Sequence, residues 1–189
     1  QFALLRDYRL IQAAVDYEYA RTLNGCGFPV RVHVAVDTGM HRLGEPYRHT
    51  ERIQAICRME HLQAEGIFSH LCTEEPEIVA RQARAFEQIC RELEKAGITG
   101  LKRHLLASGG IVSCPQLGGD YARAGIALYG ILSTREEEER CPIPLFPVLS
   151  LKARVASVRE LEEGEGAGYG LRFTAKRRTK LAALSIGYA

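Results

Sequence analysis

The sequence of 189 residues predicts an α/β domain with a parallel sheet, followed by a region of β structure. Three observations support this prediction. Short apolar segments alternate with helix-like segments over residues 1–131, as repeated βα units do. A charged, proline-rich stretch then interrupts the pattern, and β-type segments follow it. The net charge of +2 is nearly balanced, so nothing demands nucleic acid or a membrane as a partner.

Five segments are predicted to be strands, because short apolar runs without clean alternation are typical of parallel strands buried on both faces. They are residues 10–15, 30–36, 64–70, 103–107 and 121–128. The clearest helix is expected over residues 76–96, where Pro76 suits the first turn and Gly97 suits the end. A second helix is expected over residues 49–59. Five strands fit either an open doubly wound sheet or part of an eight-stranded barrel.

The charged run and the prolines after it predict a solvated linker over residues 133–147. This divides the chain into an α/β domain, residues 1–132, and the first part of a β domain, residues 148–189. Segments 149–161 and 180–186 are the β-type segments of the second domain. The chain starts without Met and stops in an apolar stretch, so we expect an internal piece of a longer protein.

The six cysteines have irregular spacing and form no CxxC pair, which disfavours a zinc site or a disulfide framework. We therefore expect no metal, and reduced, buried thiols in a cytoplasmic protein. No apolar run approaches the roughly 18 residues of a membrane span. No signal-peptide pattern opens the chain.

Polar residues follow the predicted strands at their carboxyl ends, where parallel α/β domains bind ligands. Arg42 follows the second strand, His70 ends the third, Ser108 follows the fourth and Arg123 lies in the fifth. Taken singly, an arginine is more often part of an ion pair, and a histidine is more often structural. Ser108 and its two following glycines suit a phosphate, although such a turn is usually only a turn. Their shared place at one rim favours a ligand site.

The motifs, in their order, resemble those of the alanine racemase family. Residues 37–44, Asp-Thr-Gly-Met-His-Arg-Leu-Gly, are similar to the family signature Asp-Thr-Gly-Met-x-Arg-Leu-Gly. Residues 104–108 resemble its His-x-x-x-Ser segment, and residues 123–130 resemble its Arg-x-Gly-Ile-x-Leu-Tyr-Gly block. Further similar segments extend the resemblance over essentially the whole chain: 66–70, 149–155, 168–170 and 186–189.

This resemblance implies a TIM-type (β/α)8 barrel, of which the chain carries about strands four to eight, followed by the start of an all-β domain. It implies an isomerase that interconverts L- and D-alanine through an aldimine of pyridoxal phosphate and supplies D-alanine for the cell wall. The lysine that holds the cofactor would precede Gln1. The chain's own lysines do not fall at that place, so we expect the isolated chain to be inactive; they are Lys95, Lys102, Lys152, Lys176 and Lys180.

The resemblance also implies roles in proton transfer. One proton carrier is the absent lysine, and the other resembles Tyr169, contributed across the interface of a homodimer. Arg123 would face the pyridine nitrogen of the cofactor and keep it unprotonated. His70 would link that arginine to the tyrosine.

Other residues resemble those that hold the cofactor and the small amino-acid substrate. Arg42 would bond the cofactor's phenolic oxygen and, with Met40, line the site of the substrate carboxylate. The phosphate would meet Ser108 and the N–H groups of Gly125 and Ile126. One departure is Ala35, which stands where many family members have a carbamylated lysine that orients this arginine.

Three alternatives stay open. The sequences of residues 40–45 and 120–123 are similar to those of membrane-anchored serine racemases, in which a transmembrane domain precedes the racemase domain. A non-catalytic domain that binds pyridoxal phosphate or has a regulatory role is a second alternative. An unrelated barrel that binds a small molecule is a third.

Overall fold

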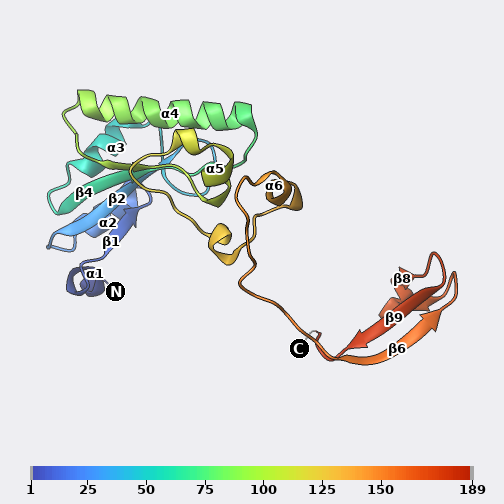
Figure 1. The fold of residues 1–189 in the computed structure, drawn as a ribbon. Helices are drawn as coiled ribbons and strands as arrows, with labels where there is room; N and C mark the ends of the chain where they lie inside the picture. The colour runs from blue at the N-terminus through green and yellow to red at the C-terminus, as the bar shows by residue number, and fades with distance from the viewer. Residues whose placement is uncertain (1, 188–189) are drawn as a thin grey trace. The chain divides into compact units, whose positions relative to one another are not determined.

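The structure, a computed structural model, describes residues 2–187. The chain divides into two compact units, and the boundary falls between Pro147 and Val148 (Figure 1). Within the described residues, no helix is both long and apolar enough to cross a membrane.

The first unit is built on a parallel sheet with the order β1-β2-β4-β5. The helices α2 and α3 precede β2 and β4, and the long helix α4 packs over the sheet before β5 (Figure 1). The predicted parallel sheet and both predicted helices are thus confirmed. The bounds of these elements are β1 Ile11–Ala14, α2 Tyr17–Asn24, β2 Val30–Asp37, α3 Thr50–Cys57, β4 Leu62–Phe68, α4 Pro76–Lys95 and β5 Lys102–His104.

Shorter elements complete this unit. They are α1 Phe2–Asp7, the two-residue strand β3 Glu45–Pro46, α5 Ser108–Ser113 and α6 Arg135–Arg140, with 3₁₀ turns at Pro115–Leu117 and Ile126–Tyr129. Strand β3 pairs with the carboxyl end of β2 and so closes the loop that contains Arg42. The amino end of α5 presents Ser108.

The two faces of β2 differ in polarity, which the sequence analysis missed. Val30, Val32, Val34 and Val36 are buried in the core that α3 and α4 cover. The alternate residues of the strand therefore lie on the opposite face, because successive side chains of a strand point to opposite sides. They are Arg31, His33, Ala35 and Asp37. The prediction of a strand without alternation was wrong at β2, and its second face is where the polar residues gather.

An irregularity in β4 brings a glycine beside one of these residues. Val32 pairs with Ala64, but His33 pairs with Gly66, so Glu65 is an extra residue in β4. Such a bulge re-aims side chains locally. Glu65 makes a two-pronged ion pair with Arg31, whose Nε lies 2.6 Å from Oε1 and whose second amino group lies 2.8 Å from Oε2.

Residues 121–128 do not form the predicted fifth strand. They contribute one isolated parallel bridge, between Ala107 and Arg123, and residues Ile126–Tyr129 turn into a 3₁₀ helix. Gly125 adopts φ −121° and ψ −100°, a backbone conformation outside the strand region, and this ends the extended chain. The apolar residues that suggested a strand are partly solvent-facing, with Leu128 69% exposed.

The segment predicted as a linker contains helix α6. Thr134 caps this helix, since its hydroxyl accepts a hydrogen bond from the N–H of Glu137 at 3.2 Å. Three glutamates in the first turn favour the helix further, because the amino end of a helix carries partial positive charge. The charged residues after Thr134 therefore form a short helix, which Thr134 caps.

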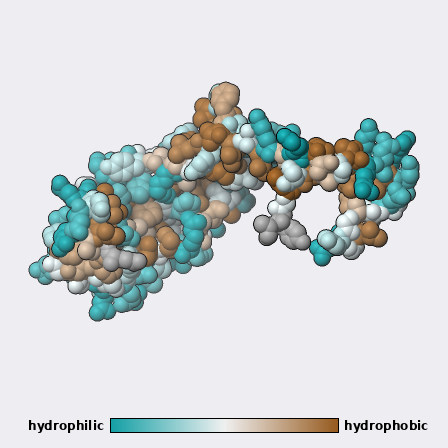
Figure 2. Space-filling view, turned by 90° about the horizontal axis from the view of Figure 1, so that it is seen from below, coloured by the Kyte–Doolittle hydropathy of each residue, from teal (hydrophilic) through white to brown (hydrophobic). Residues whose placement is uncertain are grey.

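The second unit consists of two antiparallel strand pairs. Strand β6 (Val155–Leu161) pairs with β9 (Thr179–Leu184), and β7 (Gly166–Ala167) pairs with β8 (Phe173–Thr174). The two predicted β segments are confirmed, although the first strand begins only at Val155. Hydrophobic side chains are visible on the surface of both units (Figure 2).

All six cysteines are free thiols. The expectation that they are buried holds for Cys90 and Cys114, whereas Cys72 is exposed. Burial raises the pKa of the Cys90 thiol to about 11, so this thiol stays protonated at neutral pH.

Candidate active site

Arg123 joins three segments at the carboxyl end of the sheet. One terminal amino group donates to the backbone oxygens of Ser69 and Leu105, at 2.6 and 3.2 Å. The other donates to the backbone oxygen of His104, at 3.1 Å, and to its ring Nδ1, at 2.6 Å. The loops after β4 and β5 are therefore fixed to the bridge segment by a single side chain.

The guanidinium of Arg123 carries an uncompensated positive charge. Burial lowers its pKa, but an arginine remains protonated in proteins. Among the described residues, no carboxylate forms a salt bridge with it; its neighbours are carbonyls, histidines and the ring of Phe68, whose centroid lies 5.2 Å away. Within residues 2–187, the Nε–H group of Arg123 donates no hydrogen bond. A half-buried cation with one unengaged donor suits an electron-rich acceptor on a ligand.

The two histidines next to Arg123 are neutral at physiological pH. Burial, and then the charge of Arg123, lower the pKa of His104 to about 4. The same two causes lower the pKa of His70, and the charge of Arg42 adds to them. The Nδ1 of His70 lies 3.4 Å from Arg123.

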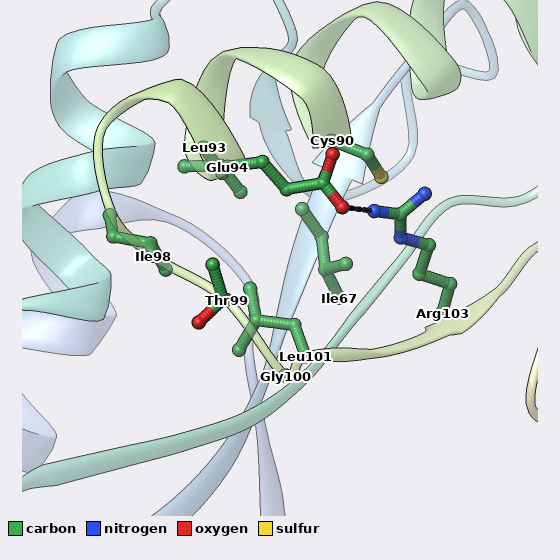
Figure 3. Close-up of a pocket in the computed structure, with 9 residues that line it drawn as sticks. All are labelled: Ile67, Cys90, Leu93, Glu94, Ile98, Thr99, Gly100, Leu101 and Arg103. Atoms are coloured by element: carbon green, nitrogen blue, oxygen red, sulfur yellow. Dashed lines mark hydrogen bonds and ion pairs between the residues drawn. The ribbon is translucent and has the colours of Figure 1, made fainter.

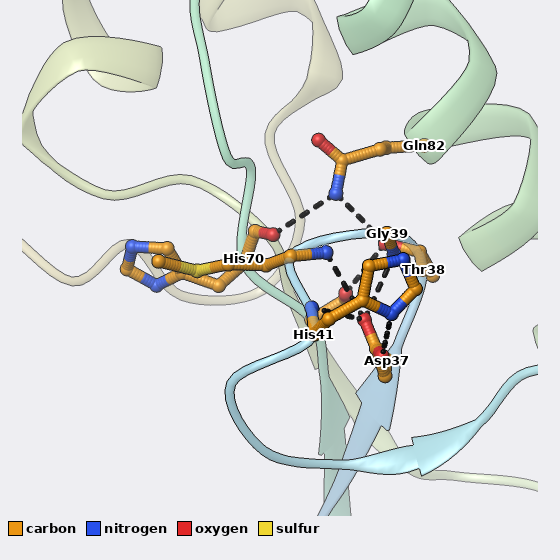
Figure 4. A network of polar contacts seen from close by, with 8 residues as sticks. Asp37, Thr38, Gly39, His41, His70 and Gln82 are labelled. Atoms are coloured by element: carbon orange, nitrogen blue, oxygen red, sulfur yellow. Dashed lines mark hydrogen bonds and ion pairs between the residues drawn. The ribbon is translucent and has the colours of Figure 1, made fainter.

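Asp37 organises the loop after β2 (Figure 4). Its Oδ1 accepts hydrogen bonds from the N–H groups of Gly39, Met40 and His41, at 2.8, 3.1 and 3.1 Å. Burial alone would raise the pKa of this carboxyl, but the bonds from Gly39 and His41 outweigh it and lower the pKa. Asp37 therefore holds the turn and positions the backbone of Met40.

Gln82 ties this loop to the one that carries His70 (Figure 4). Its amide nitrogen donates to the backbone oxygen of His70 at 3.2 Å and to the hydroxyl of Thr38 at 3.4 Å. Its amide oxygen accepts from the N–H of Cys72 at 3.0 Å. The side chain is buried, with 1% exposure, in the middle of α4. The sequence analysis missed this residue, although a glutamine between Val79 and Phe86 on an apolar helix face was a signal.

Ser108 joins the amino end of α5 to the bend at Gly125. Its Oγ accepts hydrogen bonds from the N–H groups of Gly125 and Ala127, at 2.9 and 3.2 Å. With both acceptor positions occupied, the hydroxyl proton points elsewhere and can be donated. The Gly125 N–H, one of the groups expected to meet a phosphate, donates to Ser108 in this structure. The N–H of Ile126, at the start of its 3₁₀ turn, has no partner inside that turn.

The structure thus brings together Arg123, His70 and the Ser108–Gly125 contact in the first unit. Arg42 is exposed and Met40 is half-buried, both on the loop held by Asp37. Ala35, on β2, is buried, with 1% exposure, and carries only a methyl group. Tyr169 lies in the second unit, in the short 3₁₀ turn Tyr169–Leu171, and its side chain is 96% exposed.

A pocket lies apart from these residues, between the end of α4 and β5 (Figure 3). Apolar side chains such as Ile67 and Leu93 line it, and an ion pair between Glu94 and Arg103 borders it. Arg103 and His104 point to opposite faces of β5. None of the predicted site residues lines this pocket.

A parallel α/β unit with a basic cluster beyond its strand ends, followed by a separate β unit, defines a two-domain protein of the kind in which the ends of the strands form ligand sites. Residues 1–133 match the family described as alanine racemase, N-terminal domain, and residues 148–189 match alanine racemase, C-terminal domain. The chain therefore belongs to the alanine racemase family.

Relatives and solved structures agree with this assignment. The chain is 40% identical over 191 residues to an amino-acid racemase of Enterococcus faecalis. This match covers 98% of the chain and 27% of the relative. It is 36% identical over 190 residues to the serine/alanine racemase of Enterococcus gallinarum, covering 97% of the chain and 27% of the relative. The alanine racemase from Streptomyces coelicolor superposes with a TM-score of 0.79 at 28% identity, over 96% of this chain and 50% of that one.

The chain thus spans about a quarter of the first two relatives and half of that structure. The superposition shows that its fold is that of the alanine racemases, an α/β barrel followed by a β domain.

Proposed function

We propose that the full-length protein carrying this chain is an amino-acid racemase that uses pyridoxal phosphate to interconvert L- and D-alanine. The observation that carries the proposal is Arg123, a half-buried cation with its terminal N–H groups engaged by protein acceptors and its Nε–H unengaged within the described residues. A cytoplasmic location, which fits the six free thiols, belongs to the same proposal.

The residues fit this cofactor at two points. The Nε–H of Arg123 suits a pyridine nitrogen, because a guanidinium donates a hydrogen bond without giving up its proton. The hydroxyl of Ser108 and the N–H of Ile126, beside the amino end of α5, suit phosphate oxygens. When bound, pyridoxal phosphate withdraws electrons from the substrate and so acidifies its α-proton.

In this proposal, the chain's own residues hold the ligand and move one proton. Arg123 keeps the pyridine nitrogen unprotonated, and neutral His70 beside it links the arginine to the proton carrier. Arg42 and Met40, on the loop organised by Asp37, would line the site of the substrate carboxylate, and Arg42 would also donate a hydrogen bond to the cofactor's phenolic oxygen. Proton transfer needs a second group on the other face of the substrate.

We assign that second group to Tyr169, acting on the site of a second copy of the chain in a homodimer. Its hydroxyl is exposed on the second unit and so is available to another subunit. Within the barrel, we further propose that β1, β2, β4, β5 and the bridge segment at Arg123 are strands four to eight.

Racemisation of serine is a second candidate substrate specificity. It is favoured by the 36% identity to the serine/alanine racemase of E. gallinarum and by a higher identity, 40%, to an amino-acid racemase. Both candidates use the same site and differ in the contacts of the substrate side chain. A non-catalytic regulatory role would leave the same residues in place without proton exchange.

The test is exchange of the α-proton into deuterated water by the full-length protein loaded with pyridoxal phosphate. L-alanine and L-serine are compared, and the faster substrate decides between the two candidates. We expect Tyr169→Phe to lower exchange by about 10²–10⁴-fold, the range of a lost general acid or base. Tyr8→Phe, on another exposed tyrosine, is the matched control and should exchange at the wild-type rate. Bound cofactor without exchange of either amino acid would exclude the enzyme and leave the regulatory role.

A further inference from the structure

His33, which the proposed function does not use, ends a chain of hydrogen bonds that starts at Arg123. The amino group of Arg123 lies 2.6 Å from Nδ1 of His104. The Nε2 of His104 lies 2.7 Å from Nδ1 of His33. The three side chains come from the bridge segment, β5 and β2, so residues far apart in the sequence are joined in one row.

The direction of these hydrogen bonds follows from the chemistry of arginine. A guanidinium can only donate, so Nδ1 of His104 accepts and carries no proton. Neutral His104 then has its proton on Nε2 and donates it to Nδ1 of His33. Neutral His33 in turn carries its proton on Nε2. Protonation of either Nδ1 would place two hydrogens between facing donors and break the row.

The surroundings of His33 are shaped around its ring. A Cβ atom on Gly66 would lie 2.7–2.8 Å from three atoms of the His33 ring, closer than real contacts allow, so glycine leaves the room that the ring occupies. Tyr121 stacks on the other side, with ring centroids 6.2 Å apart and planes at 11°. Phe68 stacks on His104, with centroids 4.9 Å apart and planes at 6°. These neighbours restrict the rotation of both rings.

We propose that His33 is a positioning residue for Arg123: by accepting from Nε2–H of His104, it fixes the tautomer in which Nδ1 of His104 receives the guanidinium. The inference rests on the proposed function, because Arg123 is the group that would meet the cofactor's pyridine nitrogen. His33 touches no reacting atom and acts only through His104. Burial also lowers the pKa of His33, which keeps its Nδ1 free to accept.

The first test reads the tautomers directly, in the full-length protein without cofactor and labelled with ¹⁵N-histidine. Long-range ¹⁵N–¹H correlation spectra distinguish protonated from unprotonated ring nitrogens. We expect His104 to carry its proton on Nε2 and His33 to have an unprotonated Nδ1. A proton on Nδ1 of His104 would overturn the proposal, whatever the enzyme does.

The second test uses a matched pair of variants. His33→Asn keeps an acceptor oxygen at the place of Nδ1, whereas His33→Leu has a similar shape there and cannot accept. In the Leu variant we expect the His104 nitrogen signals to shift and kcat to fall about tenfold, equivalent to about 1.4 kcal/mol, with KM within about twofold. The Asn variant should retain the wild-type signals and most of kcat.

Two further variants separate positioning from folding. Gly66→Ala pushes on the ring and should lower kcat as His33→Leu does, with the same shift of the His104 signals. His61→Leu changes a histidine outside the row and should change neither, because the hydrogen bonds of His61 within the described residues use only its backbone N–H and oxygen. Equal behaviour of the Leu and Asn variants would overturn the proposal. An inactive wild-type protein would instead overturn the proposed function, and the tautomers would still decide whether the row exists.

Discussion

The two units of the chain differ in how much of their apolar surface they bury. In the first, Ile53, Ile56 and Ile67 are at most 1% exposed, packed between the sheet and its helices. In the second, Leu149 and Leu151 are more than 80% exposed, and Ala175 is the one buried apolar residue among those described.

This difference separates two ways of placing a functional group. Arg123 is held in the first unit by hydrogen bonds to His104 and to the backbone oxygens of neighbouring segments. Tyr169 lies in the second unit between Gly168 and Gly170, both with positive φ, and its side chain is 96% exposed. Arg123 is therefore fixed by contacts within its own unit, whereas the side chain of Tyr169 is not packed against its own unit.

The largest expected effect compares the two units directly. Ile67→Ala should lower the free energy of unfolding by about 3 kcal/mol, because it leaves a cavity in a packed core. Leu149→Ala should change it by less than about 0.5 kcal/mol if the side chain is as exposed in the full-length protein as here. Urea unfolding of the full-length protein measures both. Equal losses would show that residue 149 is covered by another part of the assembly.

A second comparison tests the buried polar network. Gln82→Leu should cost about 2 kcal/mol, because the half-buried backbone oxygen of His70 and N–H of Cys72 lose their partners. It should also slow α-proton exchange by loosening the His70 loop. Gln88→Leu, on the exposed face of the same helix, is the control and should be nearly neutral. A neutral Gln82→Leu would mean that the two loops are held by other contacts.

Acid should destabilise the first unit before the second. The pKa of His104 is lowered to about 4 in the folded protein, and those of His33 and His70 are lowered too. Between about pH 6.5 and about pH 4, the unfolded chain binds protons that the folded chain does not. The free energy of unfolding is therefore highest above about pH 6.5 and falls as the pH is lowered toward about 4.

After discounting for partial solvent screening, we expect a loss on the order of 2 kcal/mol over that window. Residues 148–189 contain no histidine, so the second unit should not respond there. Unfolding curves at several pH values, followed with probes in each unit, measure this. An unchanged stability of the first unit between pH 7 and pH 5 would argue against neutral, half-buried histidines.

The smallest effect is expected at the surface of the second unit. Arg178 forms an ion pair with Glu160 across β6 and β9, with both side chains largely exposed. Arg178→Ala should change the free energy of unfolding by less than about 0.5 kcal/mol, because water and salt screen such pairs. Thermal unfolding at low and high salt measures it. A loss above about 1 kcal/mol would mean that this strand pair is buried in the full-length protein.

The elements with a repeating pattern could be predicted from the sequence, and those made by a single contact could not. Helix α4 is found within one residue of its prediction, because Pro76 and Gly97 mark its ends and its apolar face is continuous. The segment 121–128 is apolar enough to suggest a strand, yet Gly125 bends it. Helix α6 had a readable signal in Thr134 and Glu137, which the surrounding charges obscured.

The candidate site shows the same division. Residues at strand ends, such as His70 and Ser108, follow from the order of strands. The row from Arg123 to His33 does not, because it depends on a bulge at Glu65 and on rings that meet from separate strands. No local pattern records such contacts.

The missing side chain of Gly66 makes two positions interdependent in mutation. With a histidine at position 33, alanine at position 66 collides with the ring, whereas a smaller residue at position 33 removes the collision. If position 33 is mutated first, position 66 can then be changed without strain. If position 66 is mutated first, the single mutant is strained by the collision with the His33 ring. Anyone transplanting or redesigning this sheet must move the pair together.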